Sequence, residues 1–319
     1  MSTKNDQSDF HSQPQPYTIL LFYKYADIQD PADFATHQRE LLTKLGMKGR
    51  VIIAKEGINA TVEGTTEAAA EYQAAVKTDP KYGYIFADVH WKKSGGDGRA
   101  FPRLSVKVRD EIVSGYFDKA GKAIDPRVTT GKRLSPDELH EWLSRGEDVT
   151  IVDMRNNYEY KVGHFRGSID PDMDNFRDLP KVLPKLENLG LKDKKVLTVC
   201  TGGIRCEKAS GFLVANGFKD VYQLDGGIVS YMERYPGHHF DGSLYVFDGR
   251  IVMHFDDKVA AGMPGARAHT VVGRCDHCAA PSERYLNCAD NSCHVHFICC
   301  EKCEAVSGAK CKKCQAGLQ

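Results

Sequence analysis

The stretch Lys195-Val-Leu-Thr-Val-Cys-Thr-Gly-Gly-Ile-Arg205 decides the fold of the central part of the chain. It begins with an apolar run that predicts a buried strand, and its two adjacent glycines carry the chain through a tight loop into a helix. Apolar strand patterns at 149–154 and 221–224 likewise alternate with helical segments. This alternation predicts an α/β domain with a largely parallel sheet over residues 135–240.

Cys200 follows that strand directly, at the edge of the sheet where ligands bind in such domains. The loop N–H groups, the N-terminus of the next helix and Arg205 all favour a thiolate at Cys200, and the thiolate is the nucleophilic form of cysteine. The alternative is a buried, inert cysteine beside a turn. The loop residues that are candidates to bind an anionic group are Thr201, Gly202, Gly203 and Ile204.

A second cysteine, Cys206, follows the loop arginine directly. Its thiol could resolve a persulfide or a sulfenate on Cys200 by forming a disulfide. It could equally be a small packing residue in the first turn of the helix, and the sequence leaves both interpretations open. The candidate catalytic residues are therefore Cys200, Arg205 and Cys206.

The composition of the chain excludes several classes of protein. Its 319 residues predict two or three domains, and 41% apolar with 27% charged residues exclude wholesale disorder. No apolar run approaches the roughly 18 residues of a transmembrane helix, so we expect no membrane partner. Residues 1–16 are polar and predict a disordered tail rather than a secretory signal, and we expect a cytoplasmic protein.

The N-terminal region, residues 17–113, predicts a separate small domain. Its strand and helix patterns follow one another in the order βαββαβ, which is typical of a ferredoxin-like (acylphosphatase-like) α+β domain. The fold alone names no activity. The predicted strands lie at 18–23, 49–54, 57–64 and 104–109, and the predicted helices at 31–45 and 66–77.

The overall charge of zero conceals a basic segment. Residues 81–133 carry twelve basic and six acidic side chains, and the Gly- and Pro-rich stretch 114–134, which overlaps them, predicts a linker. A nucleic-acid backbone needs such a basic patch, although a solvated face explains the same charges. Trp91, Phe101 and Tyr116 could stack on bases or fill the core. The candidate backbone-binding side chains are Lys92, Lys93, Arg103, Lys107 and Arg109.

The C-terminal region, residues 241–319, holds nine of the eleven cysteines. Without an export signal, such a cluster indicates metal ligands rather than disulfides, and closely spaced pairs suit tetrahedral Zn²⁺. An iron–sulfur cluster is the alternative, and His294 and His296 are further possible ligands. We predict structural zinc, with a pairing that the sequence does not specify. The candidate ligands are Cys275, Cys278, Cys288, Cys293, Cys299, Cys300, Cys303, Cys311 and Cys314.

Three motifs in the central region resemble the rhodanese family. They are the stretch 152–168, the loop from Cys200 to Arg205, and the closing turn 224–228. The resemblance implies that Cys200 carries a persulfide whose charge Arg205 and the loop amides stabilise. Four residues separate Cys200 from Arg205, one fewer than in the related dual-specificity phosphatases, which argues against phosphate chemistry. The family residues with an expected structural role are Asp153, Arg155, Glu159 and His164.

The whole chain from Tyr17 resembles the bacterial rhodanese-domain proteins that hydroxylate the wobble uridine of tRNA with molecular oxygen. The resemblance rests on the domain order and on three stretches, 55–64, 101–109 and 200–208. It implies conversion of uridine to 5-hydroxyuridine, O₂ as co-substrate and the tRNA anticodon stem-loop as partner.

The chemistry of the hydroxylation is less defined than its substrate. The sequence contains no facial-triad spacing and no Rossmann glycine pattern, and it names no electron donor. Our hypothesis is that the Cys200 thiolate acts covalently, either by adding to C6 of uracil or by carrying an oxidised or persulfidic sulfur that Cys206 restores. The alternatives are a thiosulfate or persulfide sulfurtransferase and a non-catalytic tRNA-binding adaptor. The sequence does not indicate an oligomeric state.

Overall fold

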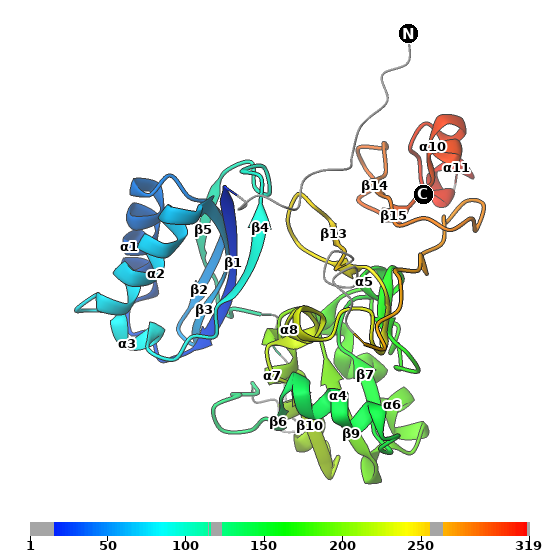
Figure 1. The fold of residues 1–319 in the computed structure, drawn as a ribbon, viewed down its shortest axis with the longest axis horizontal. Coiled ribbons are helices and arrows are strands. Elements are labelled where there is room, and N and C mark those ends of the chain that lie inside the picture. Colours follow the sequence, from blue (N-terminus) through cyan, green and yellow to red (C-terminus); the bar gives the residue numbers. More distant parts are fainter. Residues whose placement is uncertain (1–15, 114, 116–122, 256–263, 318–319) are drawn as a thin grey trace. The chain divides into compact units, whose positions relative to one another are not determined.

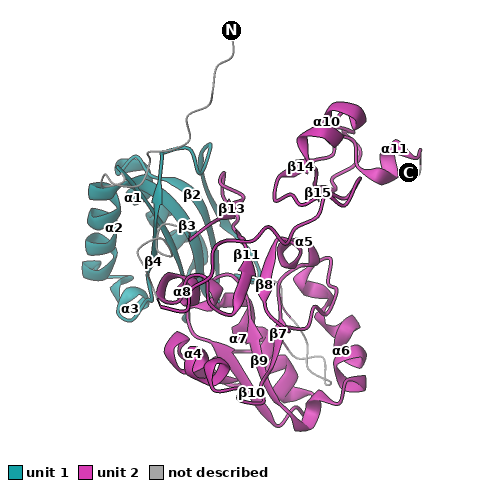
Figure 2. Cartoon of the chain, turned by 45° about the vertical axis from the view of Figure 1, so that its right-hand side comes forward, with its two compact units in different colours: residues 1–113 teal, residues 114–319 magenta. Residues whose placement is uncertain are grey.

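The computed structural model describes residues 16–113, 115, 123–255 and 264–317, and the chain divides into two compact units, residues 1–113 and 114–319 (Figures 1 and 2). Among the helices in these described ranges, none is long and apolar enough to cross a membrane.

The first unit is a five-stranded sheet with helices on one face. The strands follow the order β4-β1-β3-β2-β5, in which β3 pairs antiparallel with both β1 and β2, and β5 runs parallel to β2. The elements are β1 (Tyr17–Tyr25), α1 (Pro31–Lys44), β2 (Lys48–Ala54), β3 (Gly57–Thr65), α2 (Thr66–Thr78), α3 (Gly83–Phe86), β4 (Lys92–Gly96) and β5 (Leu104–Val108).

The strand that closes the βαββαβ arrangement differs from the predicted one. It is β4, which lies beside β1, whereas the predicted closing strand at 104–109 is β5, an additional strand at the opposite edge. The sequence of β4, Lys-Lys-Ser-Gly-Gly, has no apolar or β-branched residue and therefore gives no strand signal. Its edge position explains why such a sequence is tolerated.

Local sequence signals place the two long helices of this unit. Asp30 accepts hydrogen bonds from the backbone N–H groups of the first turn of α1, and Thr65 caps α2 in the same way. Both helices cover one face of the sheet (Figure 1), where Phe22 and Phe34 are buried in the core. Within residues 16–113, no helix lies on the other face of the sheet.

The second unit contains a parallel sheet in the order β6-β10-β9-β7, as the strand–helix alternation predicted. The strand β6 lies within the stretch 114–134, so the predicted linker contributes to the sheet. The helices and strands of the second unit up to residue 234 are β6 (Lys132–Leu134), α4 (Pro136–Ser144), β7 (Thr150–Asp153), α5 (Asn157–Tyr160), β8 (Gly163–Phe165), α6 (Leu179–Asn188), β9 (Lys195–Val199), α7 (Ile204–Ala215), β10 (Asp220–Leu224) and α8 (Gly227–Arg234). Two 3₁₀ turns, Phe176–Asp178 and Leu191–Asp193, flank α6.

The described residues in the rest of the second unit form short strands and two small helices. The antiparallel pair of β11 with β8 continues the contacts of the α/β part beyond residue 240. Farther along, Tyr285 donates a hydrogen bond to the backbone oxygen of Tyr158, so this part packs against α5. The elements are β11 (Phe240–Gly242), β12 (Leu244–Tyr245), β13 (Val252–Met253), β14 (Tyr285–Asn287), β15 (His296–Ile298), α10 (Glu301–Ser307) and α11 (Lys312–Gln315).

Candidate functional site

The loop after β9 places Cys200 at the carboxyl end of the parallel sheet. The thiol is fully buried, and the N–H of Gly203 donates a hydrogen bond to its Sγ over 3.2 Å. Gly203 adopts a φ of 98° at the start of α7, a conformation that favours glycine. The close approach of α8 requires a second glycine, because a Cβ on Gly227 would lie 2.6 Å from the Gly203 nitrogen.

The surroundings of Cys200 favour its thiolate. Burial alone raises the pKa of the Cys200 thiol, but the Cys206 thiol, the Arg205 charge and backbone N–H donors outweigh burial and lower this pKa from 9.0 to about 6. At neutral pH the side chain is therefore ionised. This environment favours the predicted thiolate, and the reactivity of Cys200 stays a prediction.

Cys206 is the partner thiol of Cys200. Its side chain is fully buried, and burial together with the hydrogen bond to Cys200 and the Cys200 charge raises the pKa of the Cys206 thiol well above 9.0. The two cysteines therefore form one thiolate and one thiol that donates to it. This contact gives Cys206 a direct effect on Cys200, which a residue that only fills space would not have.

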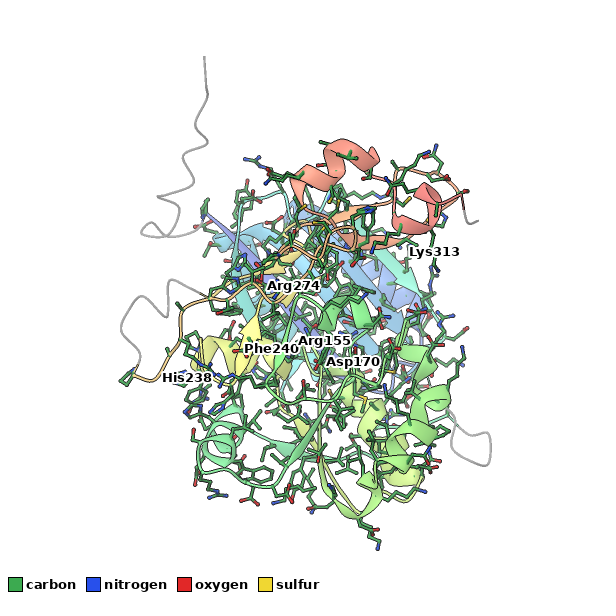
Figure 3. The ribbon with its side chains drawn as sticks, turned by 90° about the vertical axis from the view of Figure 1, so that its right-hand side faces the viewer. Arg155, Asp170, His238, Phe240, Arg274 and Lys313 are labelled. Atoms are coloured by element: carbon green, nitrogen blue, oxygen red, sulfur yellow. The ribbon has the colours of Figure 1, made fainter. Side chains whose placement is uncertain are left out.

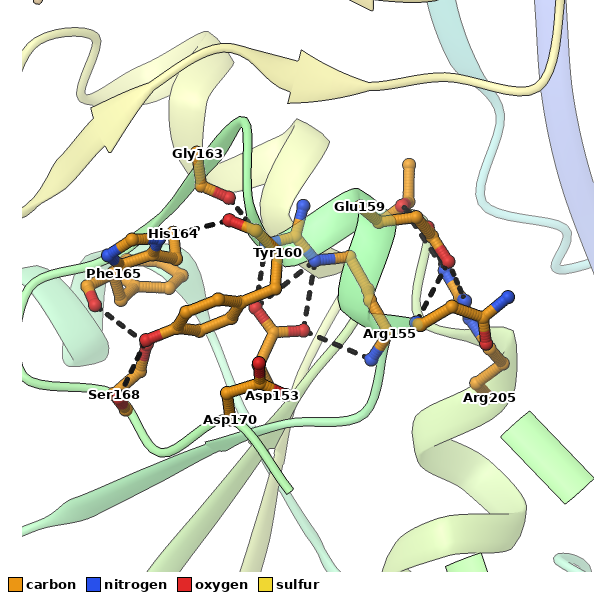
Figure 4. A network of polar contacts seen from close by, with 12 residues as sticks. Asp153, Arg155, Glu159, Tyr160, Gly163, His164, Phe165, Ser168, Asp170 and Arg205 are labelled. Atoms are coloured by element: carbon orange, nitrogen blue, oxygen red, sulfur yellow. Dashed lines mark hydrogen bonds and ion pairs between the residues drawn. The ribbon is translucent and has the colours of Figure 1, made fainter. Parts of the chain in front are cut away.

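Arg205 points its guanidinium at a carboxylate instead of leaving it free for an anion. Its Nη1 and Nη2 lie 2.5 and 2.8 Å from the two carboxylate oxygens of Glu159, which is completely buried (Figure 4). The hydroxyl of Thr201 donates to the same carboxylate over 3.3 Å. Glu159 thus fixes the loop at two points, a role that only the family motif suggested.

The other motif residues hold the sheet and its loops together, as predicted. Arg155 binds Asp153 with its Nε and Nη2, and its Nη2 also donates to the Gly163 oxygen over 2.7 Å. This guanidinium lies over the ring of Phe240, 5.9 Å from its centroid (Figure 3). His164 bonds to the Tyr160 oxygen and stacks on its ring (Figure 4).

Eight of the nine C-terminal cysteines converge in two groups of four. Within each group, one ligand atom per residue lies within 4.8 Å of all the others. Each group combines two sequence pairs that are not consecutive along the chain, which the sequence alone did not specify. The first group is Cys275, Cys278, Cys300 and Cys303, and the second is Cys288, Cys293, Cys311 and Cys314.

The geometry of both groups fits a single tetrahedral metal ion. The Sγ–Sγ distances between Cys278 and Cys300 and between Cys293 and Cys311 are both 3.7 Å. Tetrahedral zinc with Zn–S bonds of about 2.3 Å separates its sulfurs by about 3.8 Å. Backbone N–H groups also donate to the sulfurs of Cys275 and Cys288 over 3.4 Å, as expected for thiolate ligands.

The ninth predicted metal ligand, Cys299, stays a prediction. It belongs to neither group, and its buried Sγ contacts the Cys300 backbone oxygen at 3.5 Å. Burial raises the pKa of the Cys299 thiol to about 11. His296 is also outside both groups and stacks on Tyr285.

The predicted nucleic-acid-binding side chains do not form one cluster. Lys93 is exposed on β4, at the opposite edge of the sheet from β5. Lys92 is only 4% exposed, and its Nζ lies over the Tyr23 ring, so it presents no charge at the surface. The exposed candidates at β5 are Lys107 within the strand and Arg103 and Arg109 directly before and after it. Trp91 packs in the core beside Phe86 and Phe22, and Tyr116 lies outside the described residues.

Comparisons with known proteins identify relatives along most of the chain. Family models match at residues 17–112 (UPF0176 acylphosphatase like domain), 135–234 (rhodanese-like domain) and 241–315 (rhodanase C-terminal). A tRNA uridine(34) hydroxylase of Bacillus cytotoxicus is 42% identical over 293 residues, which cover 91% of this chain and 85% of that protein. Proteins of the same name from Bacillus cereus (strain AH820) and Bacillus velezensis are both 41% identical, over 91% and 89% of this chain and 86% and 83% of theirs.

Proposed function

This chain belongs to the family of tRNA uridine(34) hydroxylases, and we propose that it converts the wobble uridine of tRNA to 5-hydroxyuridine with molecular oxygen. The observation that carries the proposal is the Cys200 thiolate with the Cys206 thiol beside it, held in a loop that Glu159 fixes.

Cys200 acts as a covalent nucleophile in the proposed reaction. Its sulfur bonds to C6 of the uracil, and the electrons of the C5=C6 double bond move to C5 and O4 as an enolate. The electron-rich C5 then bonds to one oxygen atom of O₂. Without such activation, C5 of uracil is a poor partner for O₂, which explains why a low-pKa cysteine serves this chemistry.

The remaining steps balance the oxygen chemistry. Protonation gives a hydroperoxide at C5, and two electrons and two protons from a reductant of the thiol class split its O–O bond into the C5 hydroxyl and water. Loss of the original C5 proton and cleavage of the S–C6 bond restore the double bond and release Cys200 as a thiolate. Cys206 donates a hydrogen bond to this thiolate and thereby stabilises the leaving sulfur.

The two four-cysteine groups have a structural role in this proposal. The single-ion spacing of the sulfurs supports Zn²⁺ over an iron–sulfur cluster, whose several irons would separate the thiolates farther. A bound zinc ion supplies folding free energy to a region with a small apolar core. The cysteines of each group hold the ion and take no part in the reaction at Cys200.

The exposed side chains of β5 are the proposed contact for the backbone of the tRNA anticodon stem-loop. Val106 is buried on the helix-covered face, so the alternating Arg103, Lys107 and Arg109 point to the face without helices. Arg50 of β2 is also exposed there, since it pairs in register with Ser105. Positive side chains on one face suit a phosphate backbone.

The proposed reaction is tested with the purified full chain, tRNA, a thiol reductant and ¹⁸O₂. We expect 5-hydroxyuridine that contains one ¹⁸O atom, detected by mass spectrometry of the nucleosides. Label that comes from H₂¹⁸O instead of ¹⁸O₂ would contradict the proposal. Absence of product together with thiocyanate release from thiosulfate and cyanide would instead support a sulfurtransferase.

A further inference from the structure

A third group of potential ligands lies outside the cysteine groups and the Cys200 loop. His254 follows β13, His269 precedes the cysteine-rich part, and Glu283 precedes β14. One ligand atom from each lies within 4.8 Å of the other two. Neither the reaction proposed at Cys200 nor the two cysteine groups use these residues. Fourteen and thirteen residues separate them along the chain, so no short motif reveals the group.

The three side chains converge on the Glu283 carboxylate. Nε2 of His269 lies 3.1 Å and Nδ1 of His254 lies 3.9 Å from its Oε2. The imidazole rings are 4.7 Å apart between centroids and nearly perpendicular. Ligands bonded to one tetrahedral ion at about 2.0–2.1 Å lie about 3.3 Å apart, which is close to the distance between His269 and Glu283 and shorter than that between His254 and Glu283.

A buried hydroxyl holds two of these ligands in place. The Oγ of Ser243 donates to Oε1 of Glu283 over 2.9 Å and lies 2.9 Å from Nδ1 of His254. Ser243 is completely buried, and its own N–H donates to the Val162 oxygen over 2.9 Å. Such support from residues behind the ligands is typical of metal sites, where it orients the rings and the carboxylate.

We propose that His254, His269 and Glu283 form a third metal site, which binds one divalent transition-metal ion. Two imidazoles and one carboxylate are the donor set of open zinc sites and of non-haem iron sites, whereas Ca²⁺ and Mg²⁺ prefer oxygen ligands alone. The side chain of Glu283 is 11% exposed and that of His254 is 43% exposed, so solvent reaches the site. This site is therefore more exchangeable than a closed four-thiolate site.

The test is equilibrium dialysis of the full chain, as purified with its cysteine groups loaded, against Zn²⁺ and, anaerobically, against Fe²⁺. The metal content is then measured for the wild type, for His254→Ala and for His269→Ala. We expect each variant to bind one ion fewer than the wild type, whatever the cysteine groups hold. The metal for which this difference appears, Zn²⁺ or Fe²⁺, is the ion that the site binds. The matched control is His37→Ala, which removes a partly exposed histidine of α1 and is expected to keep the wild-type metal content.

Ser243→Ala gives a second, independent readout. It removes no ligand, and loss of its support is expected to weaken binding of the third ion about 10–100-fold. Equal metal content in the wild type and both histidine variants would overturn the proposal and leave only an imidazole–carboxylate hydrogen-bonding group. His254 is exposed, so without an ion at the third site its replacement is expected to leave the thermal unfolding curve unchanged. A change in metal content then reports the loss of a ligand and not the loss of the fold.

Discussion

In our proposal, cysteine serves opposite purposes in the loop around Cys200 and in the two C-terminal cysteine groups. At the loop, one thiolate stands beside one thiol and a guanidinium, with no further cysteine in the described part of the chain near enough to complete a metal site. In each C-terminal group, four sulfurs lie within 4.8 Å of one another. In our proposal, the number of neighbouring sulfurs therefore separates the nucleophile from the metal ligands.

The difference also lies in what surrounds each sulfur. The Cys200 loop is built into a large α/β core and is fixed by the buried Arg205–Glu159 pair. The C-terminal groups have only a small apolar cluster around Phe297. A reactive cysteine needs a scaffold that is stable without it, whereas a ligand cysteine is itself part of what stabilises its region.

Loss of one ligand is expected to have the largest effect on folding. Cys303→Ser removes one of four thiolates and should release one metal ion and unfold the C-terminal region, since structural zinc contributes about 10–16 kcal/mol in small zinc domains. Metal analysis and circular dichroism measure both effects. Cys299→Ser is the matched control and should keep the full metal content. Loss of an ion in this control would assign Cys299 to a site.

Breaking the buried ion pair is expected to have the next largest effect. Glu159→Gln leaves the Arg205 guanidinium without a counter-charge and should lower the free energy of unfolding by about 3–5 kcal/mol in urea. The control Glu141→Gln breaks an exposed pair with Arg145 and should change it by less than about 1 kcal/mol. Equal effects of the two substitutions would contradict the role of Glu159 in fixing the loop.

The pH dependence of hydroxylation sharpens the description of Cys200. Because its pKa lies near 6, the thiolate is lost as the pH falls, and kcat/KM should drop about tenfold per unit below pH 6 and be level above pH 7. Cys206→Ala removes a hydrogen bond that lowers this pKa and should move the profile to higher pH. A rate that still rises through pH 8 in the wild type would indicate an ordinary thiol.

The smallest expected effect concerns tRNA binding by the first unit. Lys107→Ala should weaken binding by about 1 kcal/mol, roughly fivefold, and reduce the slope of log affinity against log salt by about one. Lys77→Ala, an exposed lysine on α2, is the control, because it lies on a helix that covers the other face of the sheet. Equal loss in both variants would mean that β5 makes no specific contact.

Local patterns predicted the central part of the fold well. The strand at β9, the capping box of Ser135 and Glu138, and the position of Cys200 after its strand all agree with the sequence signals. Each of these depends on neighbouring residues, such as a run of apolar side chains or a cap three residues before an acid. The family resemblance added Glu159, whose partner lies 46 positions away.

Features that depend on distant parts of the chain were predicted less well. The strand β4 has no apolar pattern and forms only because β1 offers an edge to pair with. Lys92 and Cys299 were assigned by residue type, but the folded chain buries both. His254, His269 and Glu283 were not singled out, since only the packing of three separate segments brings them together.

The most direct test of the division between nucleophile and ligands is the level of 5-hydroxyuridine at the wobble position of tRNA in cells whose only copy is Cys200→Ala. We predict that this modification is absent, while the purified variant keeps the metal content and unfolding profile of the wild type. Wild-type levels of 5-hydroxyuridine in these cells would contradict a covalent role for Cys200.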